Sequence, residues 1–228
     1  MTMQPAHVIV PILAMRPNGE IAQFLGTGFF VGADGLLMTA DHVIRDWEGP
    51  LAIACVSDLS RTYAARIVEQ DGPHDIALLR VESYRPPSVL TLAFDGPFNS
   101  NVPLLALEYG TTKTAGREIT LGPATRLGNM TRMMNMEMLG PAGIDALELS
   151  FPALRGASGA PVMRSDNYAV WGIVVANVSY HLLPAQIESV LDEDNNIFEE
   201  VRYMLPQAAA VNIRHAREMF GRNAVPAA

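Results

Sequence analysis

The 228-residue sequence contains a single cysteine, Cys55, and no long apolar run. One cysteine cannot form an internal disulfide bond, which fits a reducing compartment. The absence of about 18 consecutive apolar residues argues against a membrane-spanning helix. The N-terminus has no basic region, and its short apolar run is interrupted by Pro11, so neither a signal peptide nor a transit peptide is indicated. A cytoplasmic location is therefore expected.

Positive charge is also scarce. The sequence has 16 Lys and Arg residues against 24 Asp and Glu residues, giving a net charge of −8, and no basic run. Nucleic acid and anionic membranes are therefore poor candidates as partners. Apolar residues make up 49% of the chain, which is ordinary for a compact protein with a substantial core.

Helical periodicity is scarce over the first 180 residues, where short apolar runs alternate with Gly, Pro, Asn and Asp. This pattern is typical of an all-β sandwich or barrel. The segment Arg85-Pro86-Pro87-Ser88 interrupts it and predicts a boundary between an N-terminal unit, 1–88, and a C-terminal unit, 89–228. In the first unit we expect strands at His7–Met15, Ile21–Val31, Leu36–Thr39, Leu51–Val56, Thr62–Val68 and Ile76–Val81. In the second we expect strands at Val89–Ala93, Pro103–Glu108, Arg117–Gly122, Met130–Leu139, Ala146–Phe151, Ala160–Arg164 and Val170–Val178.

The C-terminal portion has a different character. Residues 183–205 predict a helical insertion, since Pro184 suits a first helical turn and apolar residues follow at helical spacing. A last strand is expected at Ala208–Val211. A final helix, 213–220, would be capped by Asn212 and ended by Gly221.

The insertion at 183–205 is acidic, with six carboxylates against the single base Arg202. Such a run is usually a solvated helical face. Alternatively, it is a lid, a contact site for a regulatory protein, or an element that repels acidic substrates. Both interpretations remain open from the sequence.

A candidate nucleophile lies in the segment Arg155-Gly-Ala-Ser-Gly-Ala-Pro161. Glycine permits positive φ angles and close approach of the backbone, so Ser158 is expected on a tight turn. Such a turn presents the Ser158 hydroxyl and directs backbone N–H groups at one point, where the oxyanion of an acyl-transfer intermediate would form. Taken alone, the segment is weak evidence and is more typical of an ordinary surface turn.

A serine hydroxyl needs a base, which is usually histidine. His42 follows a short strand and a glycine-rich hairpin, at the kind of strand end where rigid scaffolds present functional groups. For the other histidines we expect packing or surface roles, and His74 is expected to face solvent. These other histidines are His7, His74, His181 and His215.

The base in turn needs an acid that fixes its tautomer. Asp75 begins the apolar run Asp-Ile-Ala-Leu-Leu and should therefore be partly buried beside a partner. Asp71 and Asp41 remain as alternatives. Cys55 is expected to be a small buried apolar residue.

Three segments together resemble the signature segments of the chymotrypsin-like (trypsin-like) serine peptidases. These are Thr39-Ala-Asp-His-Val43, Asp75-Ile-Ala-Leu-Leu79 and Gly156-Ala-Ser-Gly-Ala-Pro-Val162, and they occur in the order His, Asp, Ser. The short spacings are closest to compact bacterial HtrA-type protease domains, here without a PDZ domain. The resemblance covers roughly residues 5–220 and is poor at 180–206.

The resemblance implies two packed six-stranded antiparallel β-barrels with the site between them. His42 and Asp75 would come from the first barrel and the nucleophile Ser158 from the second. The backbone N–H groups of Gly156 and Ser158 would form the oxyanion hole. The backbone of Val175, Ala176 and Asn177 would pair with substrate.

The implied activity is that of a serine endopeptidase acting on a protein or peptide through an acyl-enzyme, with neither a metal nor an organic cofactor. The alternative is a catalytically silent module of the same fold that binds peptides. A fluorophosphonate probe would distinguish them.

Two positions depart from the family pattern. Zymogen-activated members carry Asp directly before the serine, where this chain has Ala157, so we expect no activation by N-terminal cleavage. Trypsin-like members carry Asp six residues before the serine, where this chain has Pro152. A preference for Lys or Arg before the cut is therefore not expected, and a small or medium apolar residue is favoured.

Overall fold

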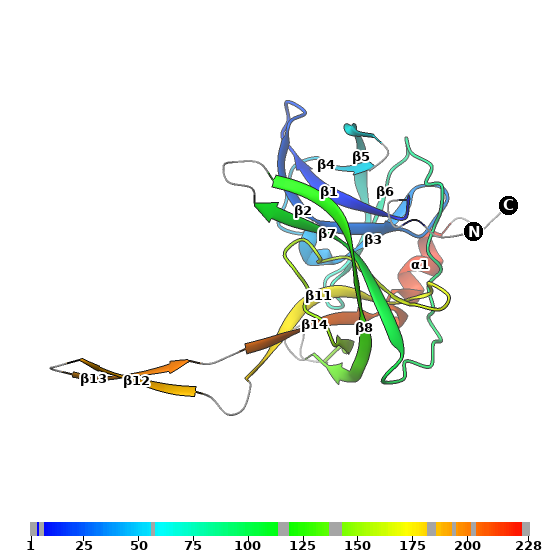
Figure 1. Cartoon of the computed structure of the whole chain (residues 1–228). Helices are drawn as coiled ribbons and strands as arrows, with labels where there is room; N and C mark the ends of the chain where they lie inside the picture. The colour runs from blue at the N-terminus through cyan, green and yellow to red at the C-terminus, as the bar shows by residue number, and fades with distance from the viewer. Residues whose placement is uncertain are drawn as a thin grey trace.

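The computed structural model describes residues 4, 7–55, 58–113, 119–136, 143–181, 186–192, 195–201 and 204–224. These residues form two closed antiparallel β-barrels, a two-stranded hairpin and a C-terminal helix (Figure 1). The strand order is β1-β2-β3-β6-β5-β4 in the first barrel and β10-β11-β14-β9-β8-β7 in the second. The prediction of two six-stranded barrels is confirmed.

The first barrel follows the sequence pattern closely. Every residue of β1 is buried, as expected for an apolar strand in a small closed barrel. The hairpin between β2 and β3 pairs Phe29 with Met38, and β3 then pairs with β6. Cys55 ends β4 and is buried, as predicted. The strands are β1 (Ile9–Met15), β2 (Ile21–Phe30), β3 (Leu36–Thr39), β4 (Leu51–Cys55), β5 (Asp58–Asp71) and β6 (Ile76–Arg80).

The second barrel departs from the prediction in two places. The strands expected at Arg117–Gly122 and Met130–Leu139 are, within the described residues, parts of one long strand, β8, which pairs with β7 over 119–129 and with β9 from Met130 onward. Residues 117, 118 and 137–139 lie outside the described residues. The strands are β7 (Pro103–Lys113), β8 (Ile119–Asn135), β9 (Asp145–Leu149), β10 (Pro161–Arg164), β11 (Val170–His181) and β14 (Met204–Asn212).

The predicted strand at Val89–Ala93 is also wrong. This segment runs between the barrels and makes one isolated bridge, from Leu92 to Val170. Its backbone is divided between the two barrels, because Leu90 N–H donates to Phe30 O and Ala93 N–H donates to Val170 O, at 2.9 and 3.0 Å. Because its backbone groups bond to one barrel and then to the other, the segment does not form a regular strand in either sheet.

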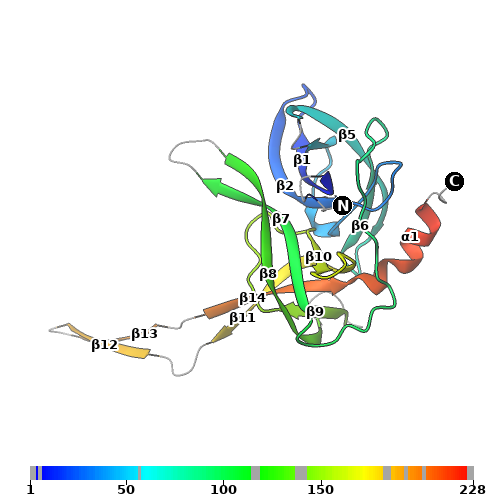
Figure 2. The same ribbon diagram turned by 45° about the vertical axis from the view of Figure 1, so that its right-hand side comes forward.

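The predicted helical insertion at 183–205 is wrong as well. Its described residues form the strands β12 (Gln186–Asp192) and β13 (Asn195–Val201), which pair antiparallel, and then the start of β14. The Asp- and Asn-rich centre of the segment favours a turn over a continuous helix. The hairpin projects away from both barrels in both views (Figures 1 and 2).

The C-terminus returns to the first barrel. A 3₁₀ turn, η4 (Ile213–Ala216), is capped by Asn212, whose Oδ1 accepts from Arg214 N–H at 3.0 Å, as predicted. The helix α1 (Arg217–Asn223) follows and passes through Gly221, which therefore does not end it. The carbonyl oxygen of Asn223 accepts from Arg80 Nη2 of β6 at 2.9 Å, and α1 lies beside β6 (Figure 2).

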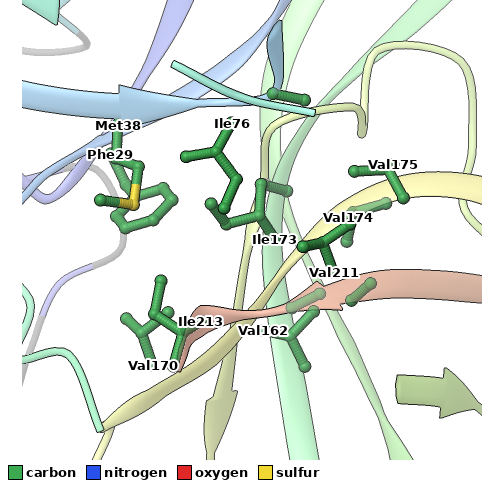
Figure 3. Packing of buried hydrophobic residues seen from close by; sticks show 14 of the residues in the cluster. Phe29, Met38, Ile76, Val162, Val170, Ile173, Val174, Val175, Val211 and Ile213 are labelled. Carbon is green, nitrogen blue, oxygen red and sulfur yellow. The ribbon is translucent and has the colours of Figure 1, made fainter. Parts of the chain in front are cut away.

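Apolar side chains of both barrels pack into one continuous buried cluster. At the junction, Phe29, Met38 and Ile76 of the first barrel lie close to Ile173, Val170 and Ile213 of the second (Figure 3). Because closely packed interiors deform little, this shared core fixes the position of one barrel against the other. No helix in the described part of the chain is long and apolar enough to cross a membrane.

Candidate active site

His42 and Asp75 form a close pair at the end of the first barrel. His42 lies in the 3₁₀ turn η2 (Asp41–Val43), directly after β3, and Asp75 precedes β6. Asp75 Oδ1 accepts from His42 N–H at 2.8 Å, and its Oδ2 lies 2.6 Å from His42 Nδ1. A carboxylate only accepts hydrogen bonds, so it selects the imidazole tautomer with the proton on Nδ1. Nε2 is then left with its lone pair, as a base requires.

The pair is largely withdrawn from water. Asp75 is 2% exposed, whereas the His42 side chain is 27% exposed. A buried carboxylate needs hydrogen-bond partners, and His42 supplies two of them. Asp75 has φ 54°, a conformation that few non-glycine residues adopt.

The two alternative acids contact other groups. Asp71 Oδ2 lies 2.7 Å from His74 Nδ1, and Asp41 Oδ1 accepts from Gln70 Nε2 at 2.7 Å. Of the three acids weighed from the sequence, Asp75 is therefore the one hydrogen-bonded to His42.

His74 is only partly exposed and is not simply a solvent-facing residue. Besides its contact with Asp71, its ring stacks on that of His215 in η4, with centroids 4.5 Å apart. Burial lowers the pKa of His215 below its ordinary value, and the nearby His74 lowers it further. His215 thus has the packing role that the sequence suggested.

Ser158 lies on a turn whose glycines are structurally required. Gly156 and Gly159 have φ 99° and 84°, values that side-chain-bearing residues rarely adopt. A Cβ atom at Gly159 would overlap the carbonyl oxygen of Thr27 and the hydroxyl of Thr39, and it would lie 3.1 Å from Ala40 N. The turn therefore lies directly against the segment that leads into His42.

The N–H groups around Ser158 are divided into two sets. Those of Ala157, Gly159 and Ala160 donate to Leu154 O, Val174 O and Ala157 O at 3.0, 2.8 and 2.9 Å. Those of Gly156 and Ser158 donate to no group in the described part of the chain. The two unused donors are the pair that the sequence predicted as an oxyanion hole.

No hydrogen bond joins Ser158 Oγ to His42 among those of the described residues. The two side chains come from different barrels, Ser158 from the turn before β10 and His42 from the turn after β3. Hydrogen bonds between nucleophile and base are often loose in the absence of substrate, so this geometry does not itself exclude a nucleophile–base pair.

The strand β11 carries the predicted substrate-binding residues. Val174 and Ala176 pair with Ala210 and Ala209 of β14, so Val175 lies at a bulge. On its other side, β11 pairs with β10 only as far as Ile173. Within the described residues, the edge from Val175 to Asn177 therefore has no strand beside it and can accept an extended chain.

The Asn177 side chain makes an additional contact that the sequence did not suggest. Its Oδ1 accepts from Ala153 N–H and its Nδ2 donates to Ala153 O, both at 2.8 Å. The amide therefore bridges β11 and the segment that precedes the Ser158 turn.

Two packed six-stranded antiparallel barrels make up the chymotrypsin-like fold. Here the His-Asp pair lies on the first barrel and the Ser158 turn, with its two unused N–H donors, on the second. A model of the trypsin-like peptidase domain matches residues 26–173, about two thirds of the chain. The chain belongs to this family.

Two relatives match over most of this chain, and one of them is named as a serine protease. Serine protease HTRA1 of Xenopus tropicalis is 26% identical over 201 residues, covering 84% of this chain and 41% of that protein. The uncharacterized protein y4bJ of Sinorhizobium fredii is 29% identical over 181 residues, covering 78% of this chain and 26% of that protein. The chain thus spans less than half the length of these relatives.

Solved structures show the same fold. The structure described as HtrA-type protease AlgW with decapeptide has a TM-score of 0.66 at 16% identity, covering 95% of this chain and 64% of that one. The active form of the Rv3671c protease of M. tuberculosis has a TM-score of 0.64 at 18% identity, covering 98% of this chain and 84% of that one.

The sequence interpretation missed Thr27, which contacts the Ser158 turn from β2. Thr27 N–H donates to Ser158 O at 2.9 Å, and Thr27 Oγ1 donates to Gly156 O at 2.8 Å. The available signal was Gly26-Thr-Gly28, a hydroxyl residue between two glycines inside a strand. Glycine inside a strand often marks a close approach of another backbone.

We predict that Gly159→Ala destabilises the protein far more than Gly19→Ala. Both glycines have positive φ, but a Cβ at Gly19 meets no atom within 4 Å, whereas at Gly159 it overlaps Thr27 and Thr39. Backbone strain alone should cost about 1 kcal/mol at Gly19, and strain plus overlap about 3 kcal/mol or more at Gly159. Denaturant unfolding of both variants measures the difference. Equal losses would contradict the tight contact between the barrels.

Proposed function

We propose that the protein is a serine endopeptidase in which His42, Asp75 and Ser158 form the catalytic triad. The observation that carries the proposal is the pairing of both Asp75 carboxylate oxygens with His42, at 2.8 and 2.6 Å. The unused N–H groups of Gly156 and Ser158 support it, because they provide two donors for an oxyanion beside the nucleophile.

The proposed reaction has two halves. Ser158 Oγ attacks the substrate carbonyl carbon while His42 Nε2 takes the hydroxyl proton, and the N–H groups of Gly156 and Ser158 stabilise the resulting oxyanion. The carbon–nitrogen bond then breaks, and the leaving amine takes the proton from His42. Water next attacks the acyl-enzyme ester, giving its proton to His42, which returns a proton to Ser158 Oγ. Asp75 orients His42 and stabilises the imidazolium.

A protein or peptide is the proposed substrate. The unpartnered edge of β11 at Val175, Ala176 and Asn177 supports this, since an extended peptide can add to such an edge through its backbone. One related structure, the HtrA-type protease AlgW, is described with a decapeptide.

The competing function is a catalytically silent module that binds peptides in the same place. The absence of a Ser158–His42 hydrogen bond among those of the described residues favours this alternative. Both functions require the β11 edge, but only the endopeptidase requires the Ser158 hydroxyl. Substitution of Ser158 therefore separates them.

We expect Ser158→Ala to abolish peptide hydrolysis while leaving the fold intact, since Ser158 is only half-buried. Asp75→Asn should lower kcat by about 10³–10⁴-fold, because an amide no longer selects the Nδ1-protonated tautomer. Hydrolysis of a peptide library before and after substitution measures these effects. Wild-type cleavage by Ser158→Ala would refute the nucleophile assignment.

For the residue before the cut, we propose a small or medium apolar side chain. Pro152 offers no negative charge, and the Asn177 amide holds Ala153 against β11, which narrows the space between these two segments. We place the binding position for that residue between them.

Asn177→Ala should therefore increase kcat/KM for peptides with Leu or Phe before the cut, relative to Ala, by about 10-fold. Asn167→Ala is the matched control, because the Asn167 amide also accepts a backbone N–H, that of Ala169, but in the turn between β10 and β11. Kinetics on a peptide series varied at that position decide the outcome. An unchanged Leu-to-Ala ratio in Asn177→Ala would contradict the proposed narrowing.

We also propose that the acidic segment 183–205, now seen as a projecting hairpin, contacts a regulatory protein or charged parts of the substrate. The segment carries six carboxylates against one base, Arg202, which favours contact with a positively charged surface.

Deletion of 185–204 should change peptide preference, raising kcat/KM for acidic peptides relative to basic ones. The reason is the loss of the six carboxylates of the segment, which stand against one base. Cleavage of charge-reversed peptide pairs at low salt measures the effect. Unchanged rates and preferences would contradict a role for the hairpin in substrate choice.

A further inference from the structure

Thr27 is completely buried, and every polar group it carries is used. Its N–H donates to Ser158 O at 2.9 Å, and its carbonyl oxygen accepts from Thr39 Oγ1 at 2.8 Å. Its hydroxyl contacts both Gly156 O, at 2.8 Å, and Tyr109 N–H, at 2.9 Å. One residue of the first barrel thus binds two separate parts of the second.

The direction of the hydroxyl proton follows from these contacts. The Tyr109 N–H is a donor only, so Thr27 Oγ1 must be its acceptor. The single hydroxyl proton is then left for Gly156 O, which is an acceptor only. One donor and one acceptor therefore fix the orientation of the Thr27 hydroxyl. If it rotated away from Gly156 O, a buried polar group would lose its hydrogen bond.

The two carbonyl groups that Thr27 holds belong to the residues of the proposed oxyanion hole. Gly156 O and Ser158 O are both drawn toward β2, while the N–H groups of the same residues donate to no group in the described part of the chain. Holding the carbonyl oxygens restricts rotation of the turn, which keeps its N–H groups in one orientation before substrate arrives. Oxyanion stabilisation depends on donors that need no reorganisation.

We propose that Thr27 is a positioning residue for the oxyanion turn, acting on the reaction through Gly156 and Ser158 without touching the substrate. This inference rests on the proposed endopeptidase function. It assigns the first barrel a second contribution beyond His42 and Asp75.

The central test is Thr27→Val, which keeps the shape of the side chain and removes its hydroxyl. We expect acylation by a fluorophosphonate probe, and kcat for a peptide, to fall about 10–100-fold with KM nearly unchanged. The midpoint of the pH–rate profile should stay where it is, because the His42–Asp75 pair is untouched. Thr27→Ser, which keeps the hydroxyl, should restore most of the rate.

Thr131→Val is the matched control. The Thr131 hydroxyl also makes hydrogen bonds across two strands, to Glu148 Oε1 at 2.5 Å and to Glu148 O at 3.2 Å, but between β8 and β9 of the second barrel. This variant should react with the probe at the wild-type rate. The comparison shows whether the loss of rate is specific to position 27 or follows from removing any threonine hydroxyl that bonds across two strands.

All rates are compared at a temperature well below the unfolding midpoint of each variant. If Thr27→Val does not fold, the comparison between Thr27→Ala and Thr27→Ser decides, with slow labelling expected for Ala alone. Labelling of the folded, hydroxyl-free variant at the wild-type rate would overturn the proposal while leaving the endopeptidase function standing. A wild-type protein that never reacts would overturn the function and this inference together.

Discussion

The structure depends on a buried carboxylate that directs both of its oxygens to one histidine. Asp75 receives the His42 N–H on one oxygen and faces Nδ1 with the other, and it does so directly before β6, whose first four residues are fully buried. Burying a carboxylate is unfavourable unless it accepts hydrogen bonds, and the position of His42 provides two of them. The same contact fixes the tautomer and leaves Nε2 available as a base.

The second requirement is that a turn of the other barrel remain in place beside this pair. Three contacts hold the two barrels together. They are the shared apolar core, the bond between the C-terminal helix and Arg80, and the bonds from Thr27 of β2 to the Ser158 turn. Of these three contacts, the bonds from Thr27 are made at the Ser158 turn itself. Ala157 is buried in this turn, and the bonds from Thr27 to Gly156 O and Ser158 O join uncharged groups.

Much of the fold and the site could be predicted from local patterns, and the errors have physical reasons. Short apolar runs between turn residues were enough to predict an all-β sandwich or barrel, and the resemblance of three motifs to the chymotrypsin-like peptidases predicted two barrels. The residues around His42 left Asp71 and Asp41 as alternatives to Asp75, which the family resemblance favoured. The structure shows that Asp75 is the acid hydrogen-bonded to His42. Residues 183–205 suggested a helix because apolar spacing there fits both periodicities, while cross-strand pairing decides the outcome. Likewise β8 was divided because Gly and Pro inside it resemble breaks. Thr27 was missed because the partners of its hydroxyl lie more than 80 positions away.

Reaction of the purified protein with a fluorophosphonate probe, with the modified residue located by peptide mass spectrometry, tests the central claim most directly. An activated serine displaces fluoride and forms a stable adduct, whereas an ordinary serine does not. The account predicts one adduct on Ser158 that is lost in Ser158→Ala and strongly slowed in His42→Ala. A folded wild-type protein that forms no adduct, or forms it at another residue, would contradict the account.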